Sequence, residues 1–121
     1  MKLLHFFSVL SPHDQLQKDI VDAGDHLVIV EFGADWCGPC GLMEKNITDL
    51  QKCMDDVIIL HSDVVKDPKS ADEYEIDTVP TFKFVFHNQT INDTVRGMYY
   101  VHMISNTKIL SFKKFDRELF E

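Results

Sequence analysis

Two cysteines separated by two residues are the part of this sequence best suited to chemistry. Cys37 and Cys40 enclose Gly38 and Pro39, and they follow an apolar run, Leu27–Phe32, that predicts a buried strand. The residues from Cys40 onward predict a helix, so Cys37 lies where free N–H groups and the helix dipole stabilise a thiolate. Such a thiol has a lowered pKa and is nucleophilic near neutral pH. We expect Cys40, one turn deeper and more buried, to attack a mixed disulfide formed through Cys37.

The same cysteine spacing is also found in half of a zinc site. Zinc would need two further ligands at suitable spacing. The chain offers only Cys53 and six scattered histidines, with no second pair of cysteines two residues apart. The sequence therefore favours redox chemistry, and we expect no bound metal.

An acidic residue interrupts the apolar run ahead of the cysteines. Glu31 lies six residues before Cys37, and burying a carboxylate is costly unless it has a partner or a task. A desolvated carboxyl is suited to accepting a proton during catalysis. We therefore predict that Glu31 supports the chemistry of the cysteines, the alternative being a glutamate at a strand edge that reaches water.

The elements that must position these residues alternate along the chain. The patterns predict strands over Leu3–Leu10, His26–Gly33, Val57–His61, Thr81–His87 and Ile91–Arg96, and helices from Pro12 to about Ala23, from Cys40 to Met54, from Asp67 to about Tyr74 and over Ser111–Phe120. Strands that alternate with helices are parallel, whereas the last two strands predict a hairpin. We expect one domain, residues 1–121, with a mixed α/β sheet and helices on both faces. Residues 98–110 fit neither periodicity.

Composition narrows the range of partners and compartments. With 20 acidic and 12 basic side chains, a net charge of −8 argues against binding nucleic acid or an anionic membrane surface. No stretch approaches the roughly 20 apolar residues of a membrane helix. Three cysteines are not a disulfide framework, which favours a compartment where thiols stay reduced. We expect a cytoplasmic protein.

A second motif makes the sequence resemble the thioredoxin family. The pentapeptide Trp36-Cys37-Gly38-Pro39-Cys40 matches that family's active site, and Thr78-Val79-Pro80-Thr81 matches its cis-proline loop about 40 residues later. The resemblance covers roughly residues 3–97 in the order and spacing of elements. It implies a thioredoxin fold, with about five strands in a mixed central sheet and about four helices around it. It also implies disulfide exchange with protein substrates.

The resemblance implies roles for individual residues near the cysteines. Pro80 would be cis and lie beside them, and the backbone of Val79 would pair with a bound peptide. Trp36 would cover the site, although plain hydrophobic packing is an alternative. Gly97 would leave room for the substrate, unless it is a simple turn glycine. At the position of Glu31 thioredoxins usually have Asp, and Glu is more similar to the catalytic domains of protein disulfide isomerases.

The sequence departs from the family's pattern close to the cysteines. Gly33 replaces an aromatic residue, Gly41 replaces a common Lys, and Lys45 stands where the family often has Pro. His61 falls near a family Lys beside the buried acid, and we expect it to be solvated or packed. Cys53 lies on the apolar stripe of its helix, which predicts a buried structural thiol.

These features together predict a protein-disulfide reductase that functions in redox homeostasis. We expect a monomer without bound cofactor, which receives electrons from a reductase of the thioredoxin-reductase type. One alternative is an isomerase or oxidase of a secretory compartment, to which Glu31 and three glycosylation sequons at Asn46, Asn88 and Asn92 are relevant. Without a convincing signal peptide we expect these sequons to be unused. The other alternative is a non-catalytic interaction module with this fold.

Overall fold

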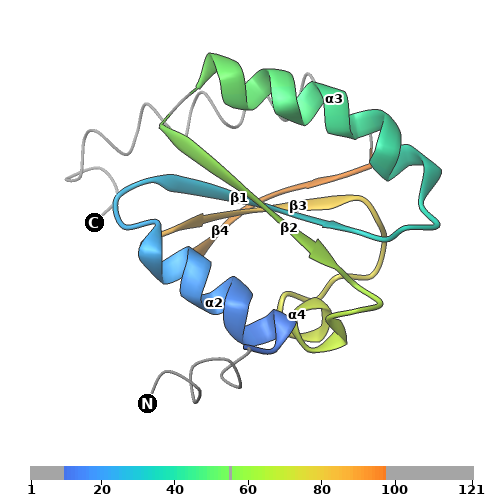
Figure 1. The fold of residues 1–121 in the computed structure, drawn as a ribbon, viewed down its shortest axis with the longest axis horizontal. Helices are drawn as coiled ribbons and strands as arrows, with labels where there is room; N and C mark the ends of the chain where they lie inside the picture. The colour runs from blue at the N-terminus through green and yellow to red at the C-terminus, as the bar shows by residue number, and fades with distance from the viewer. Residues whose placement is uncertain (1–9, 55, 98–121) are drawn as a thin grey trace, which may run out of the picture.

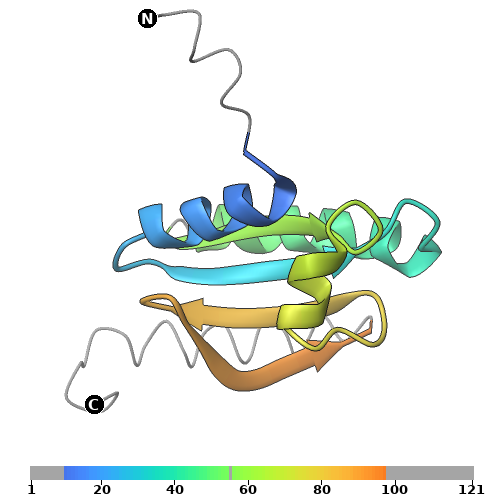
Figure 2. The same cartoon turned by 90° about the horizontal axis from the view of Figure 1, so that it is seen from below.

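A four-stranded sheet forms the centre of the part of the chain that the computed structural model describes, residues 10–54 and 56–97. The strands lie in the order β2-β1-β3-β4 (Figure 2). Strand β2 is parallel to β1, while β3 is antiparallel to both β1 and β4. The mixed sheet predicted from the sequence is thereby confirmed, and its strands are β1 (Leu27–Gly33), β2 (Val57–Asp63), β3 (Thr81–Phe86) and β4 (Gln89–Arg96).

Helices α2 (Pro12–Asp22) and α4 (Pro68–Glu73) begin where the sequence predicts, because each has a side-chain cap. The Ser11 hydroxyl accepts a hydrogen bond from the Asp14 N–H at 3.1 Å. The Asp67 carboxylate accepts from the Ser70 N–H at 3.0 Å. Each cap satisfies an N–H group that lacks a partner within the helix, and a proline follows it at the first helical position.

Strand β1 is buried on both faces and divides the core in two. Leu27 and Ile29 face α3 (Gly38–Cys53), whose Met43, Ile47 and Leu50 pack against them. The alternate residues of β1, namely Val28, Val30 and Phe32, face α2 on the other side. Figure 1 shows the same arrangement, with α3 on one face of the sheet and α2 and α4 on the other. The layout follows from the alternation of side chains along a strand, and it confirms the predicted helices on both faces.

The hairpin between β3 and β4 is tighter than the sequence indicates. The sequence predicts strands that end at His87 and begin again at Ile91, but β3 ends at Phe86 and β4 begins at Gln89. His87 and Asn88 both have positive φ angles, 50° and 60°. Two residues with positive φ are typical of a type I′ turn, whose twist matches that of the flanking strands. Asn tolerates this conformation, so the turn forms without the glycine that we looked for.

Two residues of the predicted apolar stripe on α3 do not enter the core. Leu42 is 67% exposed, and Cys53 is exposed as a free thiol. The expectation that Cys53 is a buried structural thiol is therefore wrong. Helix α3 also begins at Gly38, two residues earlier than expected, so that Cys37 is its N-cap.

Several predictions fall outside the described residues. The expected strand over Leu3–Leu10 lies there except for Leu10, which is exposed and has no regular structure. The segment 98–110 and the expected helix over Ser111–Phe120 also lie outside. Within the described ranges, no helix combines the length and apolar character needed to cross a membrane.

Two leucines on α3 test how the helix is anchored. Leu50 is 3% exposed and Leu42 is 67% exposed. Leu50→Ala should lower the free energy of unfolding by about 2–5 kcal/mol, because it leaves a cavity against the sheet. Leu42→Ala, the matched control on the same helix, should change it by less than about 0.5 kcal/mol. Urea denaturation followed by circular dichroism measures both, and equal losses would contradict the observed packing of α3.

Candidate functional site

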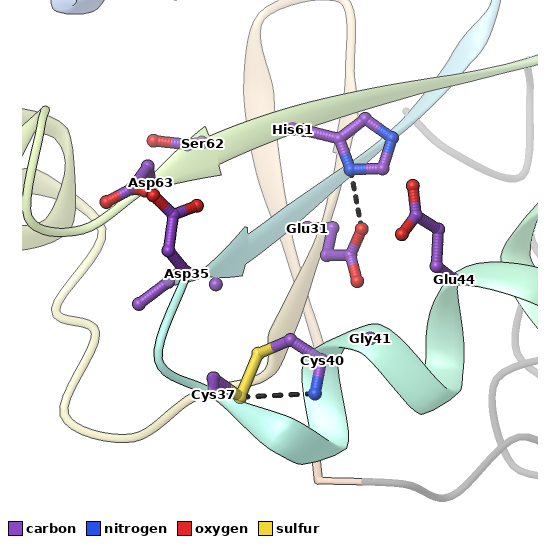
Figure 3. A pocket seen from close by; sticks show the side chains of 11 residues that line it. Glu31, Asp35, Cys37, Cys40, Gly41, Glu44, His61, Ser62 and Asp63 are labelled. Atoms are coloured by element: carbon purple, nitrogen blue, oxygen red, sulfur yellow. Dashed lines mark hydrogen bonds and ion pairs between the residues drawn. A yellow bond between two sulfur atoms is a disulfide. The ribbon is translucent and has the colours of Figure 1, made fainter.

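The paired cysteines form a disulfide at the first turn of α3. Cys37 and Cys40 are bonded through their sulfurs, with Cα atoms 5.3 Å apart. The N–H of Cys40 donates a hydrogen bond to the Cys37 Sγ at 3.1 Å (Figure 3). Cys37 is thus the N-cap of the helix, with its sulfur directed at an N–H group that has no partner within the helix. The same contact would stabilise a thiolate on Cys37 once the disulfide is reduced.

The two cysteines differ in exposure, but in the opposite sense to our expectation. Cys37 is 8% exposed, whereas Cys40 is only partly buried. The prediction that Cys40 is the deeper residue is therefore wrong for the disulfide form. The reason lies at Gly33, where a Cβ atom would approach the Cys40 Sγ to 3.2 Å. Because Gly33 has no side chain, β1 passes close to this sulfur without a Cβ atom against it.

A cavity of about 330 Å³ opens on this side of the disulfide. Both cysteines line it, together with Gly33 and two residues of the neighbouring strands, Glu31 and His61. It is large enough for several water molecules. Three further carboxylates, those of Asp35, Glu44 and Asp63, belong to the lining as well.

Glu31 is buried and paired with the histidine beside it. It is 6% exposed, so the alternative of a strand-edge glutamate that reaches water is wrong. Glu31 and His61 are partners in the parallel register of β1 and β2. The Nδ1 of His61 lies 2.6 Å from the Oε1 of Glu31, and the His61 side chain is 60% exposed. Figure 3 shows the two side chains meeting between the strands and α3.

The exposed side chain of His61 is solvated, as we expected, and it is also paired with Glu31. Its hydrogen bond to Glu31 raises the pKa of His61 above the usual 6.5, although burial acts in the opposite direction. The charges of Glu31 and Glu44 raise the pKa further. The sequence indicated that His61 lies near the buried acid. It did not predict their contact, because the contact depends on the register of two strands.

The residues expected to contact substrate collect at the same end of the sheet. The Val79–Pro80 peptide bond is cis, as predicted, and Pro80 is buried. Phe32 pairs with Thr81 in the antiparallel register, so Pro80 directly precedes the last paired residue of β3.

Three further predicted contact residues are placed by their backbones and exposure. The N–H of Gly97 donates to the Pro80 carbonyl at 2.8 Å, and its φ of 81° favours glycine whatever else it does. Trp36 is 71% exposed, which argues against plain packing. Val79 is partly buried. The roles of these residues toward substrate stay predictions.

Metal ligation finds no support in the geometry. Among residues 10–54 and 56–97, no group of three or more His, Cys, Asp or Glu side chains is arranged to hold a metal ion. The candidate site of this region is therefore the disulfide with its cavity, and the arrangement is suited to exchanging electrons with a thiol and a proton with water.

The raised pKa of His61 predicts a pH-dependent contribution to stability. A group whose pKa is higher in the folded state stabilises the fold below its unfolded value, near 6.5, and this contribution disappears as pH rises through the folded value. His61→Gln should therefore lower the free energy of unfolding by about 0.5–1 kcal/mol at pH 6, a small value because His61 is exposed, and by less at pH 8. Urea denaturation at both pH values measures the difference.

The control for this measurement is a second histidine–carboxylate pair. The His87 Nε2 lies 2.6 Å from the Asp25 Oδ1, with both side chains exposed at the other end of β1. His87→Gln removes this contact and shows how much stability the loss of an exposed histidine–carboxylate contact costs by itself. If His61→Gln costs the same stability at pH 6 and pH 8, the charge of His61 does not contribute.

Comparisons with known proteins agree with this geometry. The family model described as Thioredoxin matches residues 8–108. A thioredoxin of Geodia cydonium is 35% identical over 95 residues, which are 78% of this chain and 87% of that protein. Human thioredoxin is 36% identical over 77 residues, 64% of this chain and 73% of that protein.

Solved structures extend the similarity to the fold. Fasciola hepatica thioredoxin superposes with a TM-score of 0.74 at 26% identity, covering 78% of this chain and 89% of that one. Oxidised mitochondrial thioredoxin 3 of Saccharomyces cerevisiae gives 0.74 at 28% identity, covering 82% and 91%. The thioredoxin fold expected from the sequence is confirmed. With its cysteine pair at disulfide distance, the chain belongs to the thioredoxin family and is a protein-disulfide oxidoreductase of the thioredoxin type.

Proposed function

We propose that this chain is a general protein-disulfide reductase. The observation that carries the proposal is the hydrogen bond from the Cys40 N–H to the Cys37 Sγ at the start of α3. In the reduced protein this donor favours a thiolate on Cys37 over one on Cys40, because it satisfies the sulfur at the positive end of the helix. An ionised Cys37 beside a protonated Cys40 is the starting state that the reduction of a disulfide requires.

The reaction proceeds in two exchange steps. The Cys37 thiolate attacks one sulfur of the substrate disulfide, forming a mixed disulfide and releasing the other substrate sulfur as a thiolate. Cys40 then loses its proton and attacks the Cys37 Sγ, which closes the Cys37–Cys40 bond and releases the second substrate thiolate. The substrate gains two electrons, the cysteine pair loses two, and protons from water and Cys40 balance the products.

Glu31 is proposed as the acceptor of the Cys40 proton. Its carboxyl is buried at 6% exposure and lines the same cavity as Cys40. Glu31 and Cys40 therefore border the same space, across which a proton can pass from the thiol to the carboxylate.

Peptide binding is proposed for the surface around the cis-proline. The backbone of Val79 would pair with an extended substrate segment, as in β-strand addition, which selects weakly for sequence. Pro80, Gly97 and the exposed ring of Trp36 would complete this surface. Gly38 and Pro39 would form the active-site loop, and Gly38 has nothing within 4 Å of the Cβ position, so the loop leaves room for a partner.

The remaining assignments extend the same proposal. We propose a single domain over residues 1–121 that acts as a monomer in the cytoplasm and contributes to redox homeostasis. Electrons would come from a reductase of the thioredoxin-reductase type, and the cysteine pair would be the redox group without a bound cofactor.

Substitution of each cysteine tests the mechanism. Cys37→Ser should lower the rate of insulin disulfide reduction by about a thousandfold or more, since the nucleophile is lost. Cys40→Ser should stop at the first step and accumulate a mixed disulfide with the substrate, which mass spectrometry detects. Cys53→Ser is the matched control, because Cys53 is an exposed free thiol at the far end of α3, and it should retain native activity.

The double variant Cys37→Ser, Cys40→Ser distinguishes the reductase from a non-catalytic interaction module. Loss of biological activity in this variant supports the reductase. Full activity would contradict it and would favour a non-catalytic interaction module that uses the thioredoxin surface.

An isomerase or oxidase of a secretory compartment is the second candidate. One structural observation favours it, namely that the sequon asparagine Asn88 is exposed at the tip of the β3–β4 hairpin, where a glycan could be attached. Glu31, which is similar to the acid of protein disulfide isomerases, is consistent with the same candidate.

The redox potential of the cysteine pair separates the two candidates. Equilibration with glutathione buffers should give a value near that of thioredoxins, about −270 mV, for a reductase. A value at or above about −200 mV, the range of the endoplasmic reticulum, would contradict the reductase and support the second candidate.

A further inference from the structure

Resting on the proposed reductase function, we propose that His61 carries the proton that Glu31 receives from Cys40 out to the water of the cavity beside Gly33. His61 does not contact the sulfurs, so it is a positioning residue that acts through Glu31. The inference follows from four features of the site, which are the burial of Glu31, the cavity, the two nitrogens of His61 and the surrounding charges.

Burial leaves Glu31 with little direct contact with water, although it lines the cavity. Its side chain is 7% exposed and lies on a strand that is covered on both faces. Leu27 and Ile29 precede it on the same face and belong to the apolar core. A proton that reaches Glu31 from Cys40 therefore cannot leave through the core, and a protonated Glu31 could not serve a second turnover.

The cavity provides the way out because Gly33 has no side chain. Its Cβ position lies 3.2 Å from the Cys40 Sγ, so a side chain at this position would crowd the sulfur. The lining of the 330 Å³ cavity includes Cys40, Glu31 and His61 together. One water-accessible space is thus bordered by the proton donor Cys40, the acceptor Glu31 and the proposed relay His61.

His61 has the geometry of a relay. Its Nδ1 is 2.6 Å from the Glu31 carboxylate, while its side chain is 60% exposed. An imidazole accepts a proton on one nitrogen and releases one from the other. The balance is simple: the proton leaves the Cys40 thiol for Glu31, passes to the imidazole, which becomes imidazolium, and is then released to water.

The charges around His61 favour the imidazolium that this step forms. Glu31 faces it from β1 and Glu44 from α3, and together they raise the pKa of His61 (Figure 3). Asp35 and Asp63 line the same cavity, and the Lys66 Nζ lies 3.7 Å from the Asp35 carboxylate. His61 also borders a second hollow, which is lined by residues of α2 and β2. The charged residues of this hollow are Asp19, Asp63, Lys66 and Asp67. Carboxylates outnumber cations around His61, which favours its protonated form.

The test separates the two exchange steps of the full-length reduced protein. A symmetrical peptide disulfide is mixed with excess protein, the reaction is quenched with acid, and the mixed disulfide and products are quantified by mass spectrometry. Formation of the mixed disulfide reports the attack by Cys37, and its decay reports the resolution by Cys40. Both rates are measured from pH 5.5 to pH 9.

In the native protein the resolution rate should rise with pH through an inflection above 6.5, because only the neutral imidazole accepts a proton. His61→Gln and His61→Lys should lose this inflection and resolve about tenfold more slowly at pH 8. Their attack by Cys37 should stay within about twofold of the native rate, which also shows that they are folded.

Three further variants distinguish a relay from a structural pair. His87→Gln removes an equally close histidine–carboxylate contact at the other end of the sheet and should leave both rates unchanged. His61→Ala should recover its resolution rate when imidazole is added, because the cavity has room for it. The resolution rate of Glu31→Gln should not recover when imidazole is added.

Each outcome has a distinct meaning. Native resolution by His61→Lys would overturn the relay, because an ion pair alone would then suffice. An inflection that persists in His61→Gln would overturn it too. If the native protein forms no mixed disulfide, the reductase function itself fails, whatever His61 does.

Discussion

The hydrogen bond from the Cys40 N–H to the Cys37 Sγ sets the position of the sulfurs, and the rest of the fold keeps this first turn of α3 in place. The turn directly follows β1, which is buried on both faces and therefore held by two cores. Met43, Ile47 and Leu50 fix α3 on one of these faces. The reactive pair thus stands on two well-packed elements, so little reorganisation is needed when the disulfide opens and closes.

Features that depend on neighbours in sequence were predictable. Adjacent residues are enough to recognise the apolar run of β1 and the caps of α2 and α4. The same holds for the cysteine pair at the junction of strand and helix. The stripe on α3 was read too broadly. An α-helix turns by about 100° per residue, so an arc of about 60° around the helix contains Met43, Ile47 and Leu50. Measured from Met43, Leu42 and Cys53 lie about 80–100° to one side. We had assigned Leu42 and Cys53 to the stripe because they are apolar. Only the residues of the arc of about 60° pack against the sheet.

Features that depend on distant segments were not predictable. The contact between Glu31 and His61 requires the register of β1 and β2, which a single sequence does not contain. Gly33 was visible as a departure from the family, yet its consequence, a cavity that reaches Cys40, appears only when α3 is placed beside the strand. The tight turn at His87 and Asn88 was missed for a different reason, since the sequence signal that we used was a glycine.

The site has two sides, and on the proposed function they have different tasks. Pro80 and Gly97 are joined by a backbone hydrogen bond at the end of β3 and β4, where an extended peptide would bring its disulfide. The cavity with Glu31 and His61 lies between β1, β2 and α3, away from that backbone pairing. Electrons would therefore be exchanged on the peptide side and the proton on the cavity side.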